Sequence, residues 1–147
     1  MREILFRGKR IDSGEWIFGM PWIFKEKSCI CPWKKGMCKY DTGFFPVEVI
    51  PETVGQYTGL KDQNGKRIFE GDILHVVSPE YEYDFNTSVG ARGGYTSGFY
   101  VDGAFGDGDF NEIGFAFDYW EEEDAEVEII GNVHDNPRLL EVENAER

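Results

Sequence analysis

Short runs of apolar residues, separated by Gly, Pro, Asn and Asp, recur along most of the chain. The runs are rich in β-branched and aromatic side chains, a composition typical of strands in small barrels and sandwiches. No long stretch repeats apolar residues with the helical period, and the 18 Gly residues disfavour long helices. The pattern therefore predicts strands at residues 4–7, 16–20, 47–50, 67–69, 73–78, 95–101, 114–119 and 127–133.

Helical signals are limited to two short segments. Asn136 is a good N-cap and Pro137 suits the first helical position, so the sequence predicts a short C-terminal turn or helix over residues 138–143. A further helical turn is expected at residues 52–57, after Pro51. The 147 residues contain no internal repeat and no linker, and their number suits one domain over 1–147.

Two tight corners are expected within residues 56–74. Asn64-Gly65 is the strongest hairpin signal in the chain, because both residues tolerate the positive φ of a type I′ turn. Glu70-Gly71-Asp72 then interrupts the apolar pattern before the next strand. Two corners so close together suit a small, strongly bent barrel.

Three separated motifs carry a resemblance to a known family. They read REILFRGKR at the N-terminus, QYTGLKDQNGKRIFEGDIL in the middle and EIIGNVHDNPRLLE near the end. Together, in this order, they closely resemble the YopX-like family of bacteriophage and prophage proteins.

The resemblance implies a mainly β fold with an SH3-like β-barrel element, long variable loops and a short C-terminal helix. It implies no catalytic activity and supplies no catalytic residues. Residues 25–40 and 90–109 depart most from the family pattern, so a function specific to this chain is expected there. The motif residues to which we assign a structural role are Tyr57, Gly59, Leu60, Asp62, Asn64, Gly65, Glu70, Gly71, Asp72, Gly131, Asn132, Asn136 and Pro137.

Charge is distributed unevenly along the chain. Residues 93–147 hold 15 acidic side chains against 2 basic ones, which accounts for the whole net charge of −13. Such a surface repels nucleic acid phosphates. The acidic stretch 118–128 either keeps the protein soluble or docks on a basic partner.

Membrane insertion and export are not expected. No apolar stretch approaches the roughly 18 residues that a bilayer span requires. The N-terminal apolar run is short and is followed by basic residues rather than by a cleavage site, which is unlike a signal peptide. We therefore expect the protein to act in the host-cell cytoplasm.

Basic and aromatic residues are interleaved over residues 22–40. Lysines that neutralise phosphates and rings that stack on bases are what single-stranded nucleic acid binding needs. In a β-rich chain the same aromatic residues also suit core or hairpin packing. The candidate binding residues are Trp22, Lys25, Lys27, Trp33, Lys34, Lys35 and Tyr40.

Glu70, Asp72 and His75 offer acid–base chemistry within the middle motif. Catalysis would require a concave pocket that collects these side chains. The structural alternative, which we favour, is that Asp72 accepts backbone N–H groups that close the corner and that Glu70 pairs with a neighbouring strand. No nucleophile elbow, P-loop or dinucleotide fingerprint is present.

Two incomplete metal patterns are also present. Cys29, Cys31 and Cys38 lack the paired spacing of a zinc site. A partial calcium loop at residues 107–118 has Glu112 where Gly is required. We therefore predict no metal and no cofactor.

The leading functional prediction is a non-enzymatic binding or regulatory module that acts through protein contacts. Small barrels expose strand edges and curved aromatic surfaces, which suit them to peptide binding or self-association. The partner, of host or phage origin, is not specified by the sequence, and a homo-oligomer is compatible with it. The alternatives are binding of single-stranded nucleic acid through residues 22–40 and an uncharacterised enzyme that uses Glu70, Asp72 or His75.

Overall fold

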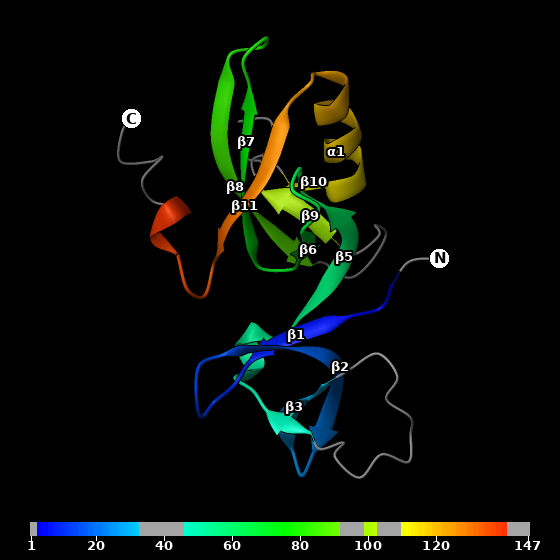
Figure 1. The fold of residues 1–147 in the computed structure, drawn as a ribbon, viewed down its shortest axis with the longest axis vertical. Helices are drawn as coiled ribbons and strands as arrows, with labels where there is room; N and C mark the ends of the chain where they lie inside the picture. Colours follow the sequence, from blue (N-terminus) through cyan, green and yellow to red (C-terminus); the bar gives the residue numbers. More distant parts are fainter. Residues whose placement is uncertain (1–2, 33–45, 92–98, 103–109, 141–147) are drawn as a thin grey trace. The chain divides into compact units, whose positions relative to one another are not determined.

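The computed structural model describes residues 3–32, 46–91, 99–102 and 110–140. The chain packs as two compact units, Met1–Gly59 and Leu60–Arg147. The described strands pair in antiparallel sheets (Figure 1), which confirms the mainly β prediction. These strands do not close into a barrel, so the SH3-like barrel element is not confirmed. The expectation of one domain over 1–147 stays a prediction.

The first unit contains strands β1 (Phe6–Lys9), β2 (Trp16–Phe24), β3 (Lys27–Pro32) and β4 (Val47–Glu48), the single turn η1 (Pro51–Thr53) and the start of β5 (Gly55–Lys61). Its sheet order is β4-β3-β2-β1-β5. The helical turn predicted at residues 52–57 is thus confined to η1, and the chain is already extended from Gly55 onward.

The core of the first unit is small and closely packed. Ile30 and Val49 are fully buried. A Cβ atom at Gly8 would lie 2.9 Å from Cγ2 of Val49 and 3.1 Å from Cγ1 of Ile30, so glycine lets the strands approach here. The Thr53 hydroxyl accepts a hydrogen bond from the Lys9 N–H at 2.9 Å and donates one to the Ile50 carbonyl at 2.6 Å, which fastens η1 to the sheet.

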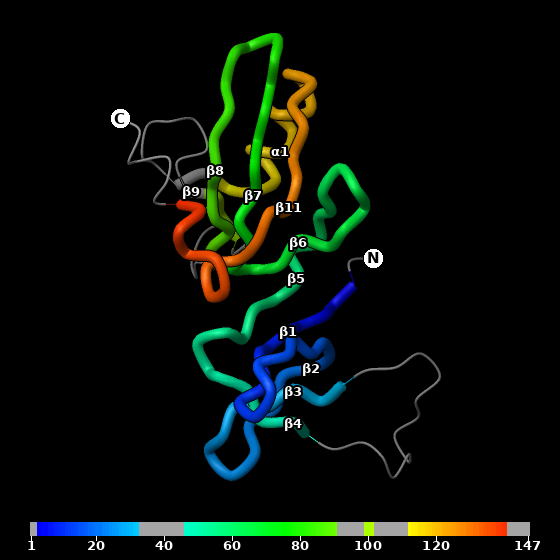
Figure 2. The backbone as a smooth tube through the Cα atoms, turned by 60° about the vertical axis from the view of Figure 1, so that its left-hand side comes forward, coloured from blue at the N-terminus to red at the C-terminus, as the bar shows by residue number. Residues whose placement is uncertain are grey.

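The second unit has β6 (Arg67–Phe69) next to the end of β5, and a sheet in the order β10-β9-β8-β7-β11. The strands of this sheet are β7 (Asp72–Ser78), β8 (Tyr83–Ala91), β9 (Phe99–Asp102), β10 (Phe110–Glu112) and β11 (Glu126–Asn132). β7 and β8 form the long hairpin seen in Figure 2. The helix α1 (Ile113–Glu122) lies between β10 and β11 in the sequence.

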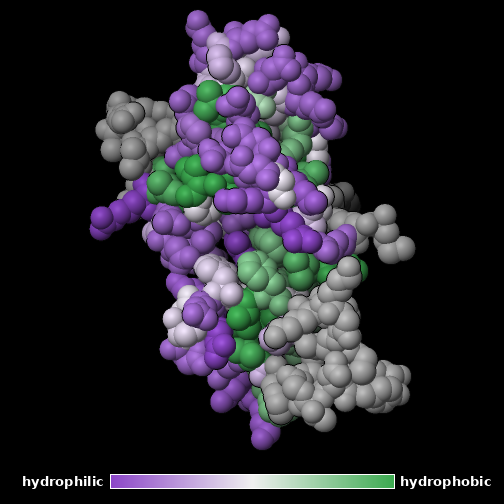
Figure 3. Space-filling view, viewed as in Figure 1, coloured by the Kyte–Doolittle hydropathy of each residue, from purple (hydrophilic) through white to green (hydrophobic). Residues whose placement is uncertain are grey.

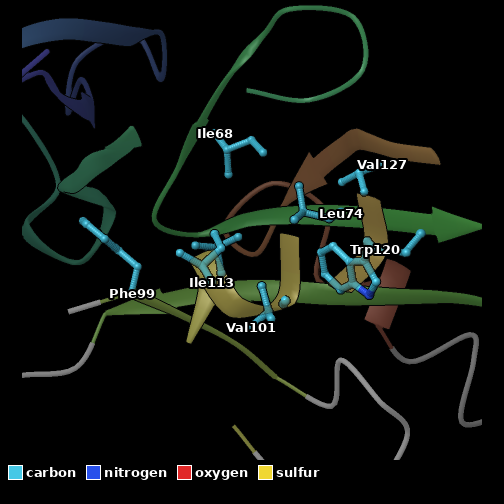
Figure 4. Packing of buried hydrophobic residues seen from close by; sticks show 10 residues of the cluster. Ile68, Leu74, Phe99, Val101, Ile113, Trp120 and Val127 are labelled. Atoms are coloured by element: carbon cyan, nitrogen blue, oxygen red, sulfur yellow. The ribbon is translucent and has the colours of Figure 1, made fainter. Parts of the chain in front are cut away.

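The prediction of a strand at residues 114–119 is wrong, because this segment belongs to α1. Ile113, Ala116 and Trp120 are buried at helical spacing against the sheet. Figure 4 shows the Ile113 and Trp120 side chains within the buried apolar cluster that also includes Leu74 and Val127. The Glu112 carboxylate caps the helix by accepting a hydrogen bond from the Phe115 N–H at 2.8 Å.

The predicted C-terminal helix begins as expected. Residues 138–140 are helical, and the rest of the predicted segment lies outside the described residues. The Asn136 side chain, however, accepts a hydrogen bond from the Asn132 N–H at 3.2 Å. It therefore closes the turn before the helix, whereas an N-cap was predicted at this position.

Candidate protein-binding surface

The β2–β3 hairpin ends in a two-residue turn made by Lys25 and Glu26. Their φ angles are 52° and 66°, and Phe24 and Lys27 form the last pair of the ladder. Positive φ at both central positions defines the type I′ turn that matches strand twist, although Asn-Gly usually occupies it. Holding two residues with Cβ atoms in this region costs roughly 1 kcal/mol each.

β2 presents an apolar face to the surface. Phe18, Met20, Trp22 and Phe24 occupy alternate positions, so their side chains share one face of the strand. Their exposed fractions are 44%, 44%, 55% and 47%, respectively. We call these four residues the β2 apolar face. In Figure 3 apolar residues are visible at the surface of the first unit.

The apolar face is flanked by lysine. The Lys25 ammonium group lies 5.5 Å from the centre of the Phe24 ring, within the range of a cation–π contact. Lys27 lies 3.7 Å from a carboxylate oxygen of Glu48. The two side chains are 62% and 41% exposed, so water screens the pair and it stabilises the fold by at most about 1 kcal/mol. The tip of the hairpin thus combines exposed rings with ammonium groups.

The candidate binding residues divide into two sets. Trp22, Lys25 and Lys27 lie together at the end of the hairpin. Trp33, Lys34, Lys35 and Tyr40 lie outside the residues that the structure describes.

Cys29 and Cys31 lie on β3 opposite Trp22 and Met20, and both are free and buried. Burial, reinforced by the neighbouring Cys29, raises the pKa of the Cys31 thiol, so the reactive thiolate is disfavoured. Within the part of the chain that the structure describes, no group of three or more His, Cys, Asp and Glu side chains could hold a metal ion. Cys38 and residues 107–109 lie outside that part.

The Asn64-Gly65 corner forms, but with a different turn from the one predicted. Gly65 has a φ of 80°, whereas Asn64 keeps a negative φ. The Gly65 N–H donates to the Asp62 carbonyl at 3.0 Å, and the Asp62 N–H donates to the Lys66 carbonyl at 2.9 Å. This geometry is a type I turn with a glycine bulge rather than type I′.

The Asp62 side chain explains the turn type. One carboxylate oxygen, Oδ1, accepts the N–H groups of Asn64 and Lys66, each at 2.9 Å. The other, Oδ2, accepts the N–H of Ile129 at 3.0 Å. The buried Asp62 thus joins the corner to β11.

Gly71 and Asp72 make the second corner. Gly71 has a φ of 94°, its N–H donates to the Val89 carbonyl at 2.7 Å, and its carbonyl accepts the Val133 N–H at 2.8 Å. The buried Asp72 carboxylate accepts the Phe69 N–H at 2.7 Å. In this geometry Asp72 closes the corner.

The candidate acid–base residues are not gathered around one point. Asp72 and His75 are three positions apart on β7, so their side chains point to opposite faces of the strand. The two His75 ring nitrogens lie 2.7 Å from Oδ1 of Asn86 and 3.2 Å from a carboxylate oxygen of Asp84. Glu70 follows β6 at the corner and is half-buried.

The remaining motif residues lie in the strands and in the turn after β11. Tyr57 is buried in β5, and its N–H donates to the Leu5 carbonyl at 2.8 Å. In the same strand Gly59 has a φ of 92°, and Leu60 packs against the core cluster of the second unit. Asn132 is the last residue of β11, and its side-chain oxygen accepts the N–H groups of His134 and Asp135 at 3.0 and 2.9 Å.

Gly131 lies against this turn. A Cβ atom there would lie 2.5 Å from Oδ1 of Asn136, so a larger residue would displace the Asn136 side chain from the turn. Pro137 follows Asn136, and its carbonyl accepts the Leu140 N–H at 3.3 Å. These contacts hold the turn after β11 against the end of the strand.

None of the described helices is long and apolar enough to cross a bilayer.

The fold and the sequence place the chain among known proteins. Residues 5–141 match the family described as YopX protein, which covers nearly the whole chain. The chain therefore belongs to the YopX protein family, as its three motifs predicted. The search of curated proteins finds no match.

The chain also resembles protein EF1440 from Enterococcus faecalis, which is known from a crystal structure. The sequence identity is 22% and the TM-score is 0.52, over 95% of this chain and 99% of that one. At this identity the likeness concerns the fold alone.

Most of the exposed surface was not predicted from the sequence. The predicted strand ended at residue 20 and Trp22 was the candidate next to it, whereas β2 continues to Phe24 and also exposes Phe18, Met20, Ile23 and Phe24. The sequence did carry one signal for this surface. Trp16–Phe24 has apolar residues at both odd and even positions, whereas a half-buried strand alternates apolar and polar residues.

Proposed function

We propose that this protein is a non-enzymatic binding module, encoded by a phage or prophage, that acts through protein contacts in the host-cell cytoplasm. The observation that carries the proposal is the β2 apolar face beside Lys25 and Lys27. Exposure of contiguous apolar surface to water is unfavourable, and such patches mark interaction sites. Aromatic side chains of this kind supply most of the binding energy at protein interfaces.

Substitution at the hairpin tests the proposal. Trp22→Ser removes the central ring of the β2 apolar face, and Tyr81→Ser is the matched control, because Tyr81 is 54% exposed on a turn of the second unit. Tagged wild-type protein and both variants are used for affinity capture from host lysate. We expect at least one protein to be retained by the wild type and by Tyr81→Ser and to be lost with Trp22→Ser, while the thermal melts of all three agree. Identical captured sets would contradict the proposal.

Binding of single-stranded nucleic acid is the second candidate. It is favoured by one observation, the exposed Trp22 and Phe24 rings next to the Lys25 and Lys27 ammonium groups. Fluorescence anisotropy with a labelled single-stranded oligonucleotide tests it. Affinity that falls as salt rises, with a logarithmic slope of about −0.7 per phosphate contact, and that is lost in Trp22→Ser, supports it. No binding at low salt removes it.

A further inference from the structure

The outer face of α1 carries exposed rings and exposed carboxylates in two parallel rows. Phe115 and Tyr119 are 59% and 42% exposed and lie one helical turn apart. Asp118 and Glu122 are exposed and are also one turn apart, and positions i, i+3, i+4 and i+7 share one face of a helix. We call Phe115, Asp118, Tyr119 and Glu122 the α1 outer face.

The carboxylates of α1 gather at the end of the helix that disfavours them. The C-terminal end of a helix carries partial negative charge, so stability favours basic residues in the last turn. The last turn of α1 has no basic residue, but it contains Glu121 and Glu122, and the exposed Asp124 follows. Repulsion between these carboxylates and the helix dipole destabilises α1, so the stability of the fold does not account for their position.

No basic side chain compensates this charge nearby. The strands β7 to β11 of the sheet on which α1 packs contain no Lys or Arg, and the sequence has neither between Arg92 and Arg138. The basic residues of the second unit that the structure describes are Lys61, Lys66, Arg67 and Arg138. Within this described part, Asp118, Glu121 and Glu122 take part in no salt bridge. In Figure 3 the upper part of the second unit, where α1 ends, is hydrophilic. A ligand for the α1 outer face must therefore offer positive charge beside apolar surface.

The spacing of the two rows indicates the shape of such a ligand. Along each row of the α1 outer face the Cβ atoms are roughly 5–6 Å apart. An amphipathic helix presents its own side chains at the same spacing and can place an apolar row beside a basic row. A strand spaces the side chains of one face by roughly 7 Å, which does not match. The face therefore favours a helix over an extended peptide.

We propose that the α1 outer face binds a basic amphipathic helix of another protein. Apolar side chains of this helix pack against Phe115 and Tyr119. Its Lys or Arg side chains neutralise Asp118 and Glu122 and relieve the repulsion at the C-terminal end of α1. The surface consists of other residues than the β2 apolar face, so the inference does not rest on the proposed function.

Binding of a synthetic peptide tests the proposal. The probe is a labelled helical peptide of about 14 residues with Leu in one row and Lys in the adjacent row. Fluorescence anisotropy at low salt is expected to show saturable binding that weakens as salt rises. Two control peptides, one with Gln in place of Lys and one that alternates Leu and Lys as a strand does, are expected to bind roughly tenfold more weakly or worse. No saturable binding of the helical probe, or equal binding of all three peptides, overturns the inference.

Paired variants separate the α1 outer face from the net charge of the protein. Asp118→Asn with Glu122→Gln removes both carboxylates of the face. The control, Glu80→Gln with Glu82→Gln, removes the same charge from exposed positions between β7 and β8. We expect the α1 variant to bind the helical probe roughly tenfold more weakly and the control to bind it as the wild type does. Equal losses in the two variants would show attraction to the net charge alone and would overturn the inference.

A second set of variants tests the rings. Phe115→Ala is expected to weaken binding of the probe roughly tenfold, whereas Tyr81→Ala, which changes a side chain that is 54% exposed outside α1, leaves it unchanged. Trp22→Ser is also expected to bind as the wild type does. Binding that is lost in Trp22→Ser and kept in Phe115→Ala would place the peptide on the β2 apolar face. That result overturns this inference and leaves the proposed function standing.

Thermal melts give a readout of opposite sign to that of a structural role. Glu121→Gln with Glu122→Gln is expected to raise the melting temperature at low salt by about 2–4 °C, because it removes repulsion at the end of α1. The same variant is expected to bind the probe more weakly. Saturating peptide is expected to raise the melting temperature of the wild type more than that of the variant. A variant that is less stable than the wild type would contradict the electrostatic argument for a basic partner and overturn the inference.

Discussion

The Asp62 carboxylate holds together several backbone segments around the middle motif. Asp62 accepts three backbone N–H groups, two within its own turn and one from Ile129, which is 67 residues further along the chain. Asp62 is buried and its three hydrogen bonds are partly buried, so water replaces these bonds only in part when the side chain is removed. Its role is to fix the turn and to attach β11 to it.

We expect Asp62→Ala to lower the free energy of unfolding by about 3 kcal/mol, since the loss of a hydrogen bond to a charged group costs about 1.5–3 kcal/mol and three partly buried bonds are lost. Asp62→Asn, which keeps one side-chain oxygen, is expected to lose less. Urea denaturation followed by circular dichroism measures both. Gln63→Ala is the control, because that side chain is exposed and the Gln63 N–H bond to the Val127 carbonyl is made by the backbone. A loss at Asp62→Ala no larger than at Gln63→Ala would refute the assignment.

Tyr83 gives a pH-dependent prediction. Burial, aided by the hydrogen bond that its hydroxyl donates to a carboxylate oxygen of Glu123 at 3.0 Å, raises the pKa of Tyr83 from 10.0 to about 12. Between these values the folded protein keeps a proton that the unfolded chain has lost. The contribution of Tyr83 to stability is therefore complete below pH 10 and disappears as the pH rises towards 12.

We expect the melting temperature of the wild type to fall across this alkaline range more steeply than that of Tyr83→Phe. Tyr81→Phe, which removes an exposed phenol, serves as the control and is expected to follow the wild type. Thermal melts at a series of alkaline pH values measure the effect. Parallel curves for the wild type and Tyr83→Phe would show that the Tyr83 proton does not contribute to folding.

What could be predicted about individual residues depended on how local their contacts are. Asp72 bonds to a backbone group three residues away, and the Gly-Asp pair already indicated such a corner. The bond from Ile129 to Asp62 exists only because β11 returns beside the corner, which no local pattern encodes. The same distant contact explains why the turn at Gly65 differs from the predicted type.

At the level of elements, the apolar pattern located strands better than it identified their type and ends. β6 agrees with the prediction at both ends, and β7 and β11 agree to within one residue. β8 was missed although larger and polar residues alternate strictly along YDFNTSVGA, because its Asp, Asn, Ser and Gly are also the residues that mark turns. α1 was mistaken for a strand because aromatic residues dominate it, and only packing against the sheet reveals the helical spacing of Ile113, Ala116 and Trp120.

The β2–β3 hairpin was missed for a related reason. Its turn residues, Lys25 and Glu26, carry none of the Gly or Asn that marks a type I′ turn. The lysine at this position supplies charge at the tip of the hairpin, and the unfavourable backbone conformation is offset elsewhere in the sheet. The Lys25 ammonium group is therefore present at the cost of a less stable turn.

We expect Lys25→Asn combined with Glu26→Gly to raise the free energy of unfolding by about 1 kcal/mol, because both new residues tolerate positive φ. The same variant is expected to weaken the binding that depends on Trp22, since it removes the Lys25 ammonium group beside the Phe24 ring. Chemical denaturation and affinity capture from host lysate measure the two effects. A variant that is both less stable and fully active in binding would contradict this account of the turn.

At the scale of the whole molecule, composition anticipated the charge distribution but not the division into units. The acidic residues that carry the net charge lie in the second unit, with α1 and β11. The boundary between the units falls within β5, a continuous strand, so no Pro- or Ser-rich linker marks it in the sequence. A boundary of this kind is defined by which side chains pack together, and that information is not local.

Net charge and exposed apolar surface together determine how the protein behaves near its isoelectric point. At pH 7 the charge of −13 keeps copies apart and opposes non-specific contact between apolar faces. At pH 4.5, the isoelectric point indicated by the composition, this repulsion vanishes while the β2 apolar face stays exposed. Light scattering during titration from pH 7 to 4 is therefore expected to show a solubility minimum near pH 4.5 for the wild type.

We expect Phe24→Ser with Trp22→Ser to make this minimum shallower, whereas Tyr81→Ser, which changes an equally exposed ring elsewhere, leaves it unchanged. Equal minima for all three proteins would mean that loss of charge alone drives precipitation and that the β2 apolar face does not promote association between copies.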